Sequence, residues 1–202
     1  MEHRLTPPEV LRCFIALPLS ATVTAGLDAV QRQLKRRCPS SAVRWVAPAS
    51  IHLTLCFLGD VLDERVAEIK AGLGVVTRYA ERFTLEVGGL GGFPNAREPR
   101  VVWVGIQEPT GQLNALAELV REAMARVGFT PEARAFSPHL TLARVQRHAS
   151  RDESRTVGDC VSQTAVGTLG QVQAEQITLF RSFLKSTGAE YTPLATFPLQ
   201  RE

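Results

Sequence analysis

The chain has 202 residues, 45% of them hydrophobic, and a formal net charge of +3 at pH 7. A disordered chain would have fewer apolar residues and a larger net charge, so this composition excludes disorder and indicates a globular protein with a core. The charge is too small to indicate nucleic-acid binding by itself, and the length suits either one domain or two small halves.

No segment of the sequence indicates export or membrane insertion. Residues 1–10 lack the apolar core of a signal peptide, and no apolar run approaches the roughly 20 residues of a membrane-spanning helix. The four cysteines form no C-x-x-C pair and no cluster with histidine, which disfavours structural zinc. We therefore expect a cytoplasmic protein without membrane association, metal or cofactor. Because no dimerisation signal is visible, we also expect a monomer.

Apolar runs and helical spacings predict alternating strands and helices in the first half of the chain. Leu27, Val30 and Leu34 recur at the spacing of a helix face, and Ser20 or Thr22 is suited to cap that helix. In chain order the predicted elements are a strand at 11–17, a helix at 20–37, strands at 42–46 and 52–58, a helix at 63–79 and a strand at 83–87.

The second half repeats this alternation after a glycine-rich segment at 88–94. That segment lacks the G-x-x-x-x-G-K pattern of a phosphate-binding loop and no helix follows it, so we predict a turn. Residues 148–156 are charged and polar, and we predict an exposed loop. The other predicted elements are a strand at 101–106, a helix at 113–127, strands at 139–142, 166–169 and 174–180, and a final hairpin within 184–199.

One tetrapeptide, HLTL, occurs twice, at residues 52–55 and 139–142. Because side chains alternate along a strand, each copy would place its histidine and threonine on one face and its leucines on the other. The leucines would anchor the strand in a core, while the polar face offers an imidazole and a hydroxyl. Two of the four histidines of the chain lie in these copies, which favours a functional pair over two unrelated strand residues.

Each tetrapeptide closes a strand–helix–strand unit. Phe14, in the first strand, precedes His52 by 38 positions, and Trp103 precedes His139 by 36. Such matched units indicate an internal duplication, and the period-2 patterns favour antiparallel pairing. We therefore predict an α+β fold of two pseudo-symmetric lobes, each an antiparallel sheet with helices packed on its outer face. A central cleft would lie between the lobes, and residues 1–202 would form one bilobal domain.

Three kinds of chemistry suit two histidines and two threonines, and they are not equally supported. A catalytic zinc needs three protein ligands, but neither histidine has a carboxylate two or four residues further on. A threonine nucleophile would lack an activating group. Two imidazoles with ordinary pKa values near 6.5 can instead divide the roles of general acid and general base. Threonine hydroxyls would then stabilise the oxygens of a phosphoryl group, and a bell-shaped pH–rate profile is expected.

These residues resemble the 2H phosphoesterase superfamily and, within it, the bacterial and archaeal RNA 2′,3′-cyclic phosphodiesterases formerly called 2′-5′ RNA ligases. The paired H-x-T-x tetrapeptides are the core of the resemblance, which covers nearly the whole chain. It also includes the segments RCFIAL at 12–17, RWV at 44–46, GFP at 92–94, FSPHLTLAR at 136–144, LFRS at 179–182 and YTPL at 191–194.

The resemblance implies a substrate and a division of roles. His52 would donate a proton to the departing 3′ oxygen, and His139 would activate water for attack on an RNA 2′,3′-cyclic phosphate end. Thr54 and Thr141 would hold phosphate oxygens, and the product would be a 2′-phosphomonoester. The reverse reaction, joining ends through a 2′-5′ linkage, is expected to be weak.

Two further residues acquire roles from the resemblance. Phe14 would stack on a base, with an ordinary core position as the alternative. Arg144 would contact phosphate, with a surface charge as the alternative. Two other functions stay open at this point: a phosphodiesterase acting on 2′-5′ oligonucleotides or on a nucleotide-derived cyclic phosphate, and a module that binds a nucleotide or RNA end without turnover.

Overall fold

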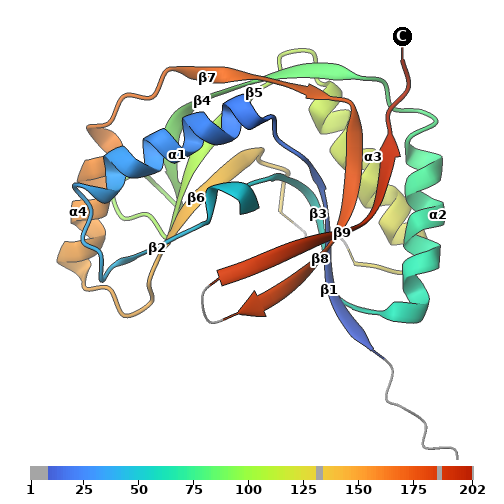
Figure 1. Cartoon of the computed structure of the whole chain (residues 1–202), viewed down its shortest axis with the longest axis horizontal. Coiled ribbons are helices and arrows are strands. Elements are labelled where there is room, and N and C mark those ends of the chain that lie inside the picture. The colour runs from blue at the N-terminus through green and yellow to red at the C-terminus, as the bar shows by residue number, and fades with distance from the viewer. Residues whose placement is uncertain (1–8, 131–133, 186–187, 202) are drawn as a thin grey trace, which may run out of the picture.

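The computed structural model describes residues 9–130, 134–185 and 188–201, and it confirms the α+β fold of two antiparallel sheets (Figure 1). The first sheet has the strand order β3-β1-β8-β9 and the second has the order β2-β6-β5-β4-β7. The strands of the first sheet are β1 (Val10–Leu17), β3 (Leu53–Leu62), β8 (Gln176–Lys185) and β9 (Gly188–Pro198). Those of the second are β2 (Val43–Trp45), β4 (Phe83–Phe93), β5 (Val101–Gln107), β6 (His139–Val145) and β7 (Thr168–Ala174).

Each strand–helix–strand unit sends its helix to the opposite lobe. The helix α1 (Ala21–Lys35) follows β1 of the first sheet but packs against β7 of the second. The helix α3 (Gln112–Arg126) follows β5 of the second sheet but packs against β3 of the first and along α2 (Val66–Val76). Figure 1 shows the result, with α1 and α4 (Arg151–Ser162) on the left and α2 and α3 on the right. Two short 3-10 turns, η1 (Pro48–Ser50) and η2 (Asp63–Arg65), flank β3.

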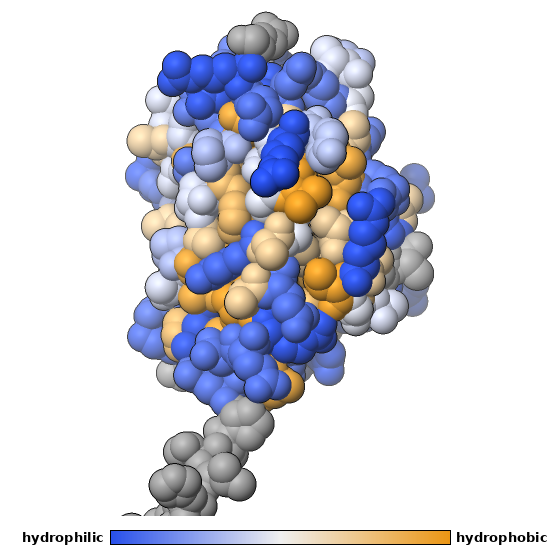
Figure 2. Space-filling model, turned by 90° about the vertical axis from the view of Figure 1, so that its right-hand side faces the viewer, coloured by the Kyte–Doolittle hydropathy of each residue, from blue (hydrophilic) through white to orange (hydrophobic). Residues whose placement is uncertain are grey.

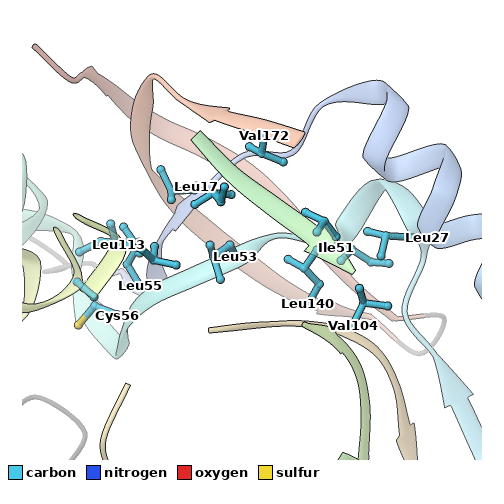
Figure 3. Packing of buried hydrophobic residues seen from close by; sticks show 14 of the residues in the cluster. Leu17, Leu27, Ile51, Leu53, Leu55, Cys56, Val104, Leu113, Leu140 and Val172 are labelled. Carbon is cyan, nitrogen blue, oxygen red and sulfur yellow. The ribbon is translucent and has the colours of Figure 1, made fainter. Parts of the chain in front are cut away.

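The leucines of both tetrapeptides lie in one hydrophobic cluster, as the strand pattern predicts. Leu53 and Leu140 are both buried in this cluster, and the other leucine of each copy is buried there as well. Gln31 of α1 donates to the backbone oxygen of Leu142 of β6, and in Figure 3 Leu113 of α3 lies near Leu55 of β3. The exchanged helices therefore each cover the tetrapeptide strand of the other unit.

The predicted glycine-rich turn at 88–94 is wrong, because β4 runs through these glycines to Phe93. Its register against β5 shifts between Gly88 and Leu90, which marks a bulge. A Cβ at Gly91 would collide with the indole ring of Trp103 on β5, so glycine allows that ring to lie flat on the strand. Glycine marks close packing here rather than a chain reversal.

The predicted loop at 148–156 is also wrong, because α4 begins at Arg151. Ser150 caps this helix: its hydroxyl accepts from the backbone N–H of Glu153 at 3.1 Å, and Glu153 accepts from the Ser150 backbone N–H at 2.9 Å. This Ser-x-x-Glu capping box was present in the sequence. The buried side of α4, which includes Val157 and Cys160, faces β4 and lies mostly beyond the polar stretch.

The C-terminal hairpin is present, but its first strand is β8, which also takes in most of the strand predicted at 174–180, and β9 pairs along the whole length of β8. Residues 186 and 187, which fall between the two strands in the sequence, lie outside the described residues. Figure 2 shows the side that carries α2 and α3, where small hydrophobic patches are separated by hydrophilic residues. Within the described ranges, no helix has the length and apolar character needed to span a membrane.

Candidate active site

All six predicted site residues line one cavity of about 520 Å³ between the two sheets. It is called the reaction cavity below. The lining residues include the histidine and threonine of both tetrapeptides, together with Phe14 from β1 and Arg144 from β6. The cleft that the repeat predicted thus brings side chains from the two halves of the sequence into one space.

Both histidines are held by the same hydrogen bond. The Nδ1 atom of His52 lies 2.9 Å from the backbone oxygen of Ser50, and Nδ1 of His139 lies 2.8 Å from that of Ser137. Since a carbonyl oxygen can only accept, Nδ1 must carry the proton in both rings. In the neutral ring Nε2 is then left free to accept a proton.

Each tetrapeptide strand contains a bulge, and the bulge determines which of the residues after the tetrapeptide faces the cavity. Leu55 of β3 has no partner residue in the pairing with β1, and Leu142 of β6 has none in the pairing with β5. Two consecutive residues are therefore buried in each strand, and the alternation of faces reverses after them. The fifth residue after each histidine returns to the cavity side, and these residues are Phe57 and Arg144.

A fully buried glutamine of α1 supports the bulge in β6. The Nε2 atom of Gln31 donates to the backbone oxygens of Val46 at 2.7 Å and Leu142 at 2.9 Å. The Leu142 oxygen also accepts from the backbone N–H of Val46 at 2.9 Å. Through these bonds, the helix that the first unit contributes positions the strand that carries His139 and Arg144.

The ring of His52 is enclosed by aromatic side chains. Phe14 stacks on it with a centroid separation of 4.4 Å, and Tyr191 of β9 contacts it edge-on at 5.0 Å. Burial disfavours the charged imidazole, so it lowers the pKa of His52 from 6.5 to about 4, and the hydrogen bond to Ser50 only partly opposes this effect. Burial also raises the pKa of Tyr191 above its usual value, although Arg144 and Arg12 act against the shift.

His139 has a different and more open surrounding. Phe93 of β4 contacts its ring edge-on at 4.9 Å, and Phe93 in turn packs on Trp103 at 5.2 Å. His139 also lines a second cavity of about 620 Å³, whereas His52 does not. We call this the arginine cavity, after its lining residues Arg100, Arg121, Arg134 and Arg144. It adjoins the reaction cavity, since Thr54, Phe57 and Arg144 line both.

The ring of Phe14 is buried among other ring side chains of the protein. Only 2% of Phe14 is exposed, and its ring contacts His52, Phe180 and Tyr191. Stacking of a base on Phe14 stays a prediction. Phe57, which sequence reasoning missed, is 56% exposed and lines both cavities. Aligning the two tetrapeptides would have found it, because Phe57 stands where the second copy has Arg144.

Two other residues of the reaction cavity were not assigned a role from the sequence. Arg12 lies on β1 two residues before Phe14, and Tyr191 lies on β9. The signal for Arg12 was its alternation with Phe14 on a strand. Tyr191 could not be placed, because its contact with His52 depends on the pairing of distant strands.

Comparison with known proteins gives a consistent picture. The model of the LigT like phosphoesterase family matches the chain twice, over residues 17–103 and 104–191. An RNA 2′,3′-cyclic phosphodiesterase of Archaeoglobus fulgidus is 33% identical over 187 residues, which cover 93% of this chain and 99% of the relative. Another, from Escherichia coli, is 29% identical over 191 residues, which cover 95% of this chain and 98% of the relative.

Solved structures agree with the fold. A crystal structure of Escherichia coli LigT complexed with 3′-AMP superposes with a TM-score of 0.74 at 28% identity, covering 95% of this chain and 99% of that one. A crystal structure of a protein from Thermus thermophilus superposes with a TM-score of 0.78 at 28% identity, covering 95% of this chain and all of the other.

Proposed function

The chain belongs to the LigT like phosphoesterase family, and we propose that it hydrolyses RNA 2′,3′-cyclic phosphate ends to 2′-phosphomonoesters without a metal. The relatives from Archaeoglobus fulgidus and Escherichia coli carry the name of this activity. The observation that carries the proposal is the gathering of both histidines and both threonines in one cavity. We expect a weak second reaction, in which a 5′-hydroxyl takes the place of water and RNA ends are joined through a 2′-5′ linkage.

The two imidazoles would act on opposite sides of the phosphorus. Nε2 of His139 would accept a proton from the attacking water, and Nε2 of His52 would donate one to the departing 3′ oxygen. The bonds of both Nδ1 atoms to backbone oxygens support this scheme, because they leave Nε2 for the substrate. Thr54 and Thr141 would donate to the non-bridging oxygens and stabilise their charge.

The role of His52 as donor requires that its ring be charged when substrate is bound. With a pKa of about 4, the ring is neutral in the free protein at pH 7. An anionic phosphate in the reaction cavity would raise that pKa, because an opposite charge nearby favours the protonated form. We therefore propose that His52 gains its proton together with the substrate.

RNA recognition would come from the two residues that follow the bulges. Arg144 would contact the phosphate, as a guanidinium suits charge-assisted hydrogen bonds to phosphate oxygens. Phe57 has the exposed ring face that a base needs for stacking, whereas the ring of Phe14 is covered. A charged donor and an aromatic platform on facing strands fit a nucleotide end.

The proposal is tested with an oligonucleotide that ends in a 2′,3′-cyclic phosphate, incubated with the protein in EDTA. Phosphorus NMR should show conversion to a 2′-phosphomonoester by the wild type and little conversion by His139→Ala or His52→Ala. His148→Ala is the matched control, since this exposed histidine lines neither cavity and should leave the rate unchanged. No conversion by the wild type, or full conversion by His139→Ala, would remove the proposal.

Two alternative functions predict different results in the same assay. A module that only binds RNA ends would bind a 2′-nucleotide tightly and convert nothing. An enzyme dedicated to 2′-5′ oligonucleotides, or to a cyclic phosphate on a free nucleotide, would convert those substrates much faster than the RNA end. Comparing kcat/KM on the three substrates separates these functions.

A further inference from the structure

Three polar side chains of the reaction cavity take no part in the proton transfers proposed above. Arg12, Ser182 and Tyr191 all line this cavity. Arg12 of β1 lies directly opposite Ser182 of β8, and Ser182 lies opposite Tyr191 of β9, on three adjacent strands (Figure 1). Residues that lie opposite one another share a face of the sheet, so a guanidinium and two hydroxyls form one row. We call these three residues the polar row.

The polar row lies beside the reaction centre and not within it. Phe14 stacks on His52, and Arg12 is two residues before Phe14 on β1. Residues two apart on a strand share a face at a separation of about 7 Å. At the other end of the row, Tyr191 contacts the His52 ring edge-on at 5.0 Å. One ribose links two successive phosphates of an RNA chain, and it can span a separation of this size.

Arg12 carries a positive charge that no carboxylate neutralises. Asp60 lies opposite Arg12 on β3, but Arg12 forms no ion pair with it or with any other residue that the structure describes. By contrast, Arg181 on the other face of the sheet pairs with Glu9 at 2.6 Å. The described residues that line the reaction cavity include no aspartate or glutamate. The charge of Arg12 is therefore left for an anionic ligand.

The hydroxyl of Tyr191 is suited to donate to such an anion. Burial raises the pKa of Tyr191, while the nearby charges of Arg144 and Arg12 act against this shift. The phenol therefore keeps its proton at neutral pH and can donate it in a hydrogen bond. Both guanidinium groups lie close enough to influence this one hydroxyl, although they come from different sheets. Arginine and hydroxyl donors together suit the oxygens of a phosphate.

We propose that the polar row binds a phosphate on the 5′ oxygen of the reacting nucleotide. This inference rests on the proposed function, because it takes the cyclic phosphate to lie between the two histidines. A 2′,3′-cyclic phosphate occupies both of the other hydroxyls of its ribose, so a second phosphate on that ribose can only be attached at the 5′ oxygen. In RNA this is the phosphodiester to the preceding nucleotide. Arg12 pairs with its charge, and Ser182 and Tyr191 donate to its oxygens. The row thus favours the end of an RNA chain over a cyclic phosphate without a 5′-phosphate.

Hydrolysis of three matched substrates tests the site. The first is a nucleoside 2′,3′-cyclic phosphate, the second carries an additional 5′-phosphate, and the third is a dinucleotide that ends in the same cyclic phosphate. For the wild type we expect kcat/KM on the second and third to exceed that on the first about tenfold or more, because hydrogen bonds between charged groups contribute at this level. Arg12→Ala should lose this gain, and Tyr191→Phe, which keeps the ring against His52, should lose part of it. Arg147→Ala, which changes an exposed arginine outside both cavities, should keep it.

The outcomes separate the phosphate site from the proposed function. A wild type that hydrolyses all three substrates at equal kcat/KM overturns the site alone. A gain confined to the dinucleotide comes from its additional nucleoside and also overturns the site, whereas a gain confined to the 5′-phosphorylated nucleotide overturns the preference for an RNA chain. Retention of the full gain by Arg12→Ala overturns the assignment to the polar row. A wild type inactive on all three substrates overturns the proposed function and the site with it.

Discussion

The half-site around His52 and the half-site around His139 are built on the same backbone plan. Each histidine donates Nδ1–H to the backbone oxygen two residues before it, and each strand has a bulge at the second leucine. Both bulges turn the fifth residue after the histidine to the cavity side. The two units therefore hold their histidine side chains with the same hydrogen bond and next to the same strand distortion.

The walls around the two histidines differ. His52 is covered by Phe14 and Tyr191, whereas His139 borders the arginine cavity. Phe57 stands where the other half has Arg144. The shared plan places one histidine of each unit in the reaction cavity, and the unequal walls give the two rings different surroundings. Burial beneath the aromatic rings disfavours the charged form of His52, so its pKa is lowered to about 4.

Removing either imidazole should have the largest effect. We expect His52→Ala and His139→Ala each to lower kcat by about 10²–10⁴-fold, since each removes one proton transfer. A cyclic substrate with sulfur in place of the 3′ oxygen separates the two roles, because a thiolate leaves without needing a proton. This substrate should restore activity to His52→Ala and not to His139→Ala. The opposite pattern of rescue would reverse the assignment of donor and acceptor.

Substitution of Arg144 and of Phe57 by alanine tests the difference between the two residues that face the cavity after the bulges. Arg144→Ala should raise KM about 10–100-fold for every cyclic phosphate substrate, because a charged hydrogen bond to phosphate is lost. Phe57→Ala should raise KM about 5–100-fold for nucleotides, since stacking contributes about 1–3 kcal/mol per base. A substrate that has a cyclic phosphate on an abasic ribose is the control. If Phe57→Ala also weakened binding of that substrate, Phe57 would not be the base platform.

Lowering the pH should destabilise the protein through His52. Its pKa is lowered to about 4 in the folded chain, so between pH 6.5 and 4 the unfolded chain binds a proton that the folded chain does not. The free energy of unfolding should therefore fall by about 1.4 kcal/mol per pH unit as the pH decreases through this window. Urea denaturation of the wild type and His52→Gln at pH 7 and pH 5 measures the difference. Equal losses in the two proteins would contradict the shift.

The same shift should appear in the activity. We expect kcat/KM to follow a bell-shaped profile whose acid limb has a midpoint near pH 4, because this ratio reports groups of the free enzyme. Proton NMR of the free protein should show the His52 ring titrating near that pH. Addition of inorganic phosphate should raise the midpoint, and an unchanged midpoint would argue against proton uptake with the substrate.

The smallest effect is expected from replacing Gln31, which supports the bulge in β6. Gln31→Met keeps the volume but leaves the backbone oxygen of Val46 without its donor, so the free energy of unfolding should fall by about 1–2 kcal/mol. Because Gln31 also holds Leu142, KM should rise as in a mild Arg144 variant. Gln33→Met, on the exposed face of the same helix, is the control for both measurements. A wild-type KM for Gln31→Met would show that Gln31 contributes to stability and not to substrate binding.

Most elements were predictable because their signals are local. The strands that begin the two units and the helices between them follow from apolar spacing over one or two turns. The predictions for residues 88–94 and 148–156 were wrong because the glycines and the polar residues there have other structural causes. Gly91 makes room for Trp103, and α4 exposes so polar a face that only its capping box distinguishes it from a loop.

By itself the sequence determined the duplicated strands, their buried leucines and the pairing of two histidines with two threonines, since a period-2 pattern needs no distant partner. Only the tertiary structure decided the exchange of α1 and α3, the bulges that turn Phe57 and Arg144 to the cavity, and the aromatic cover of His52. Each depends on which strands pair and in what register, and a shift of one residue exchanges the faces of a strand. The arginine cavity is likewise visible only in the fold, because its arginines come from segments far apart in the chain.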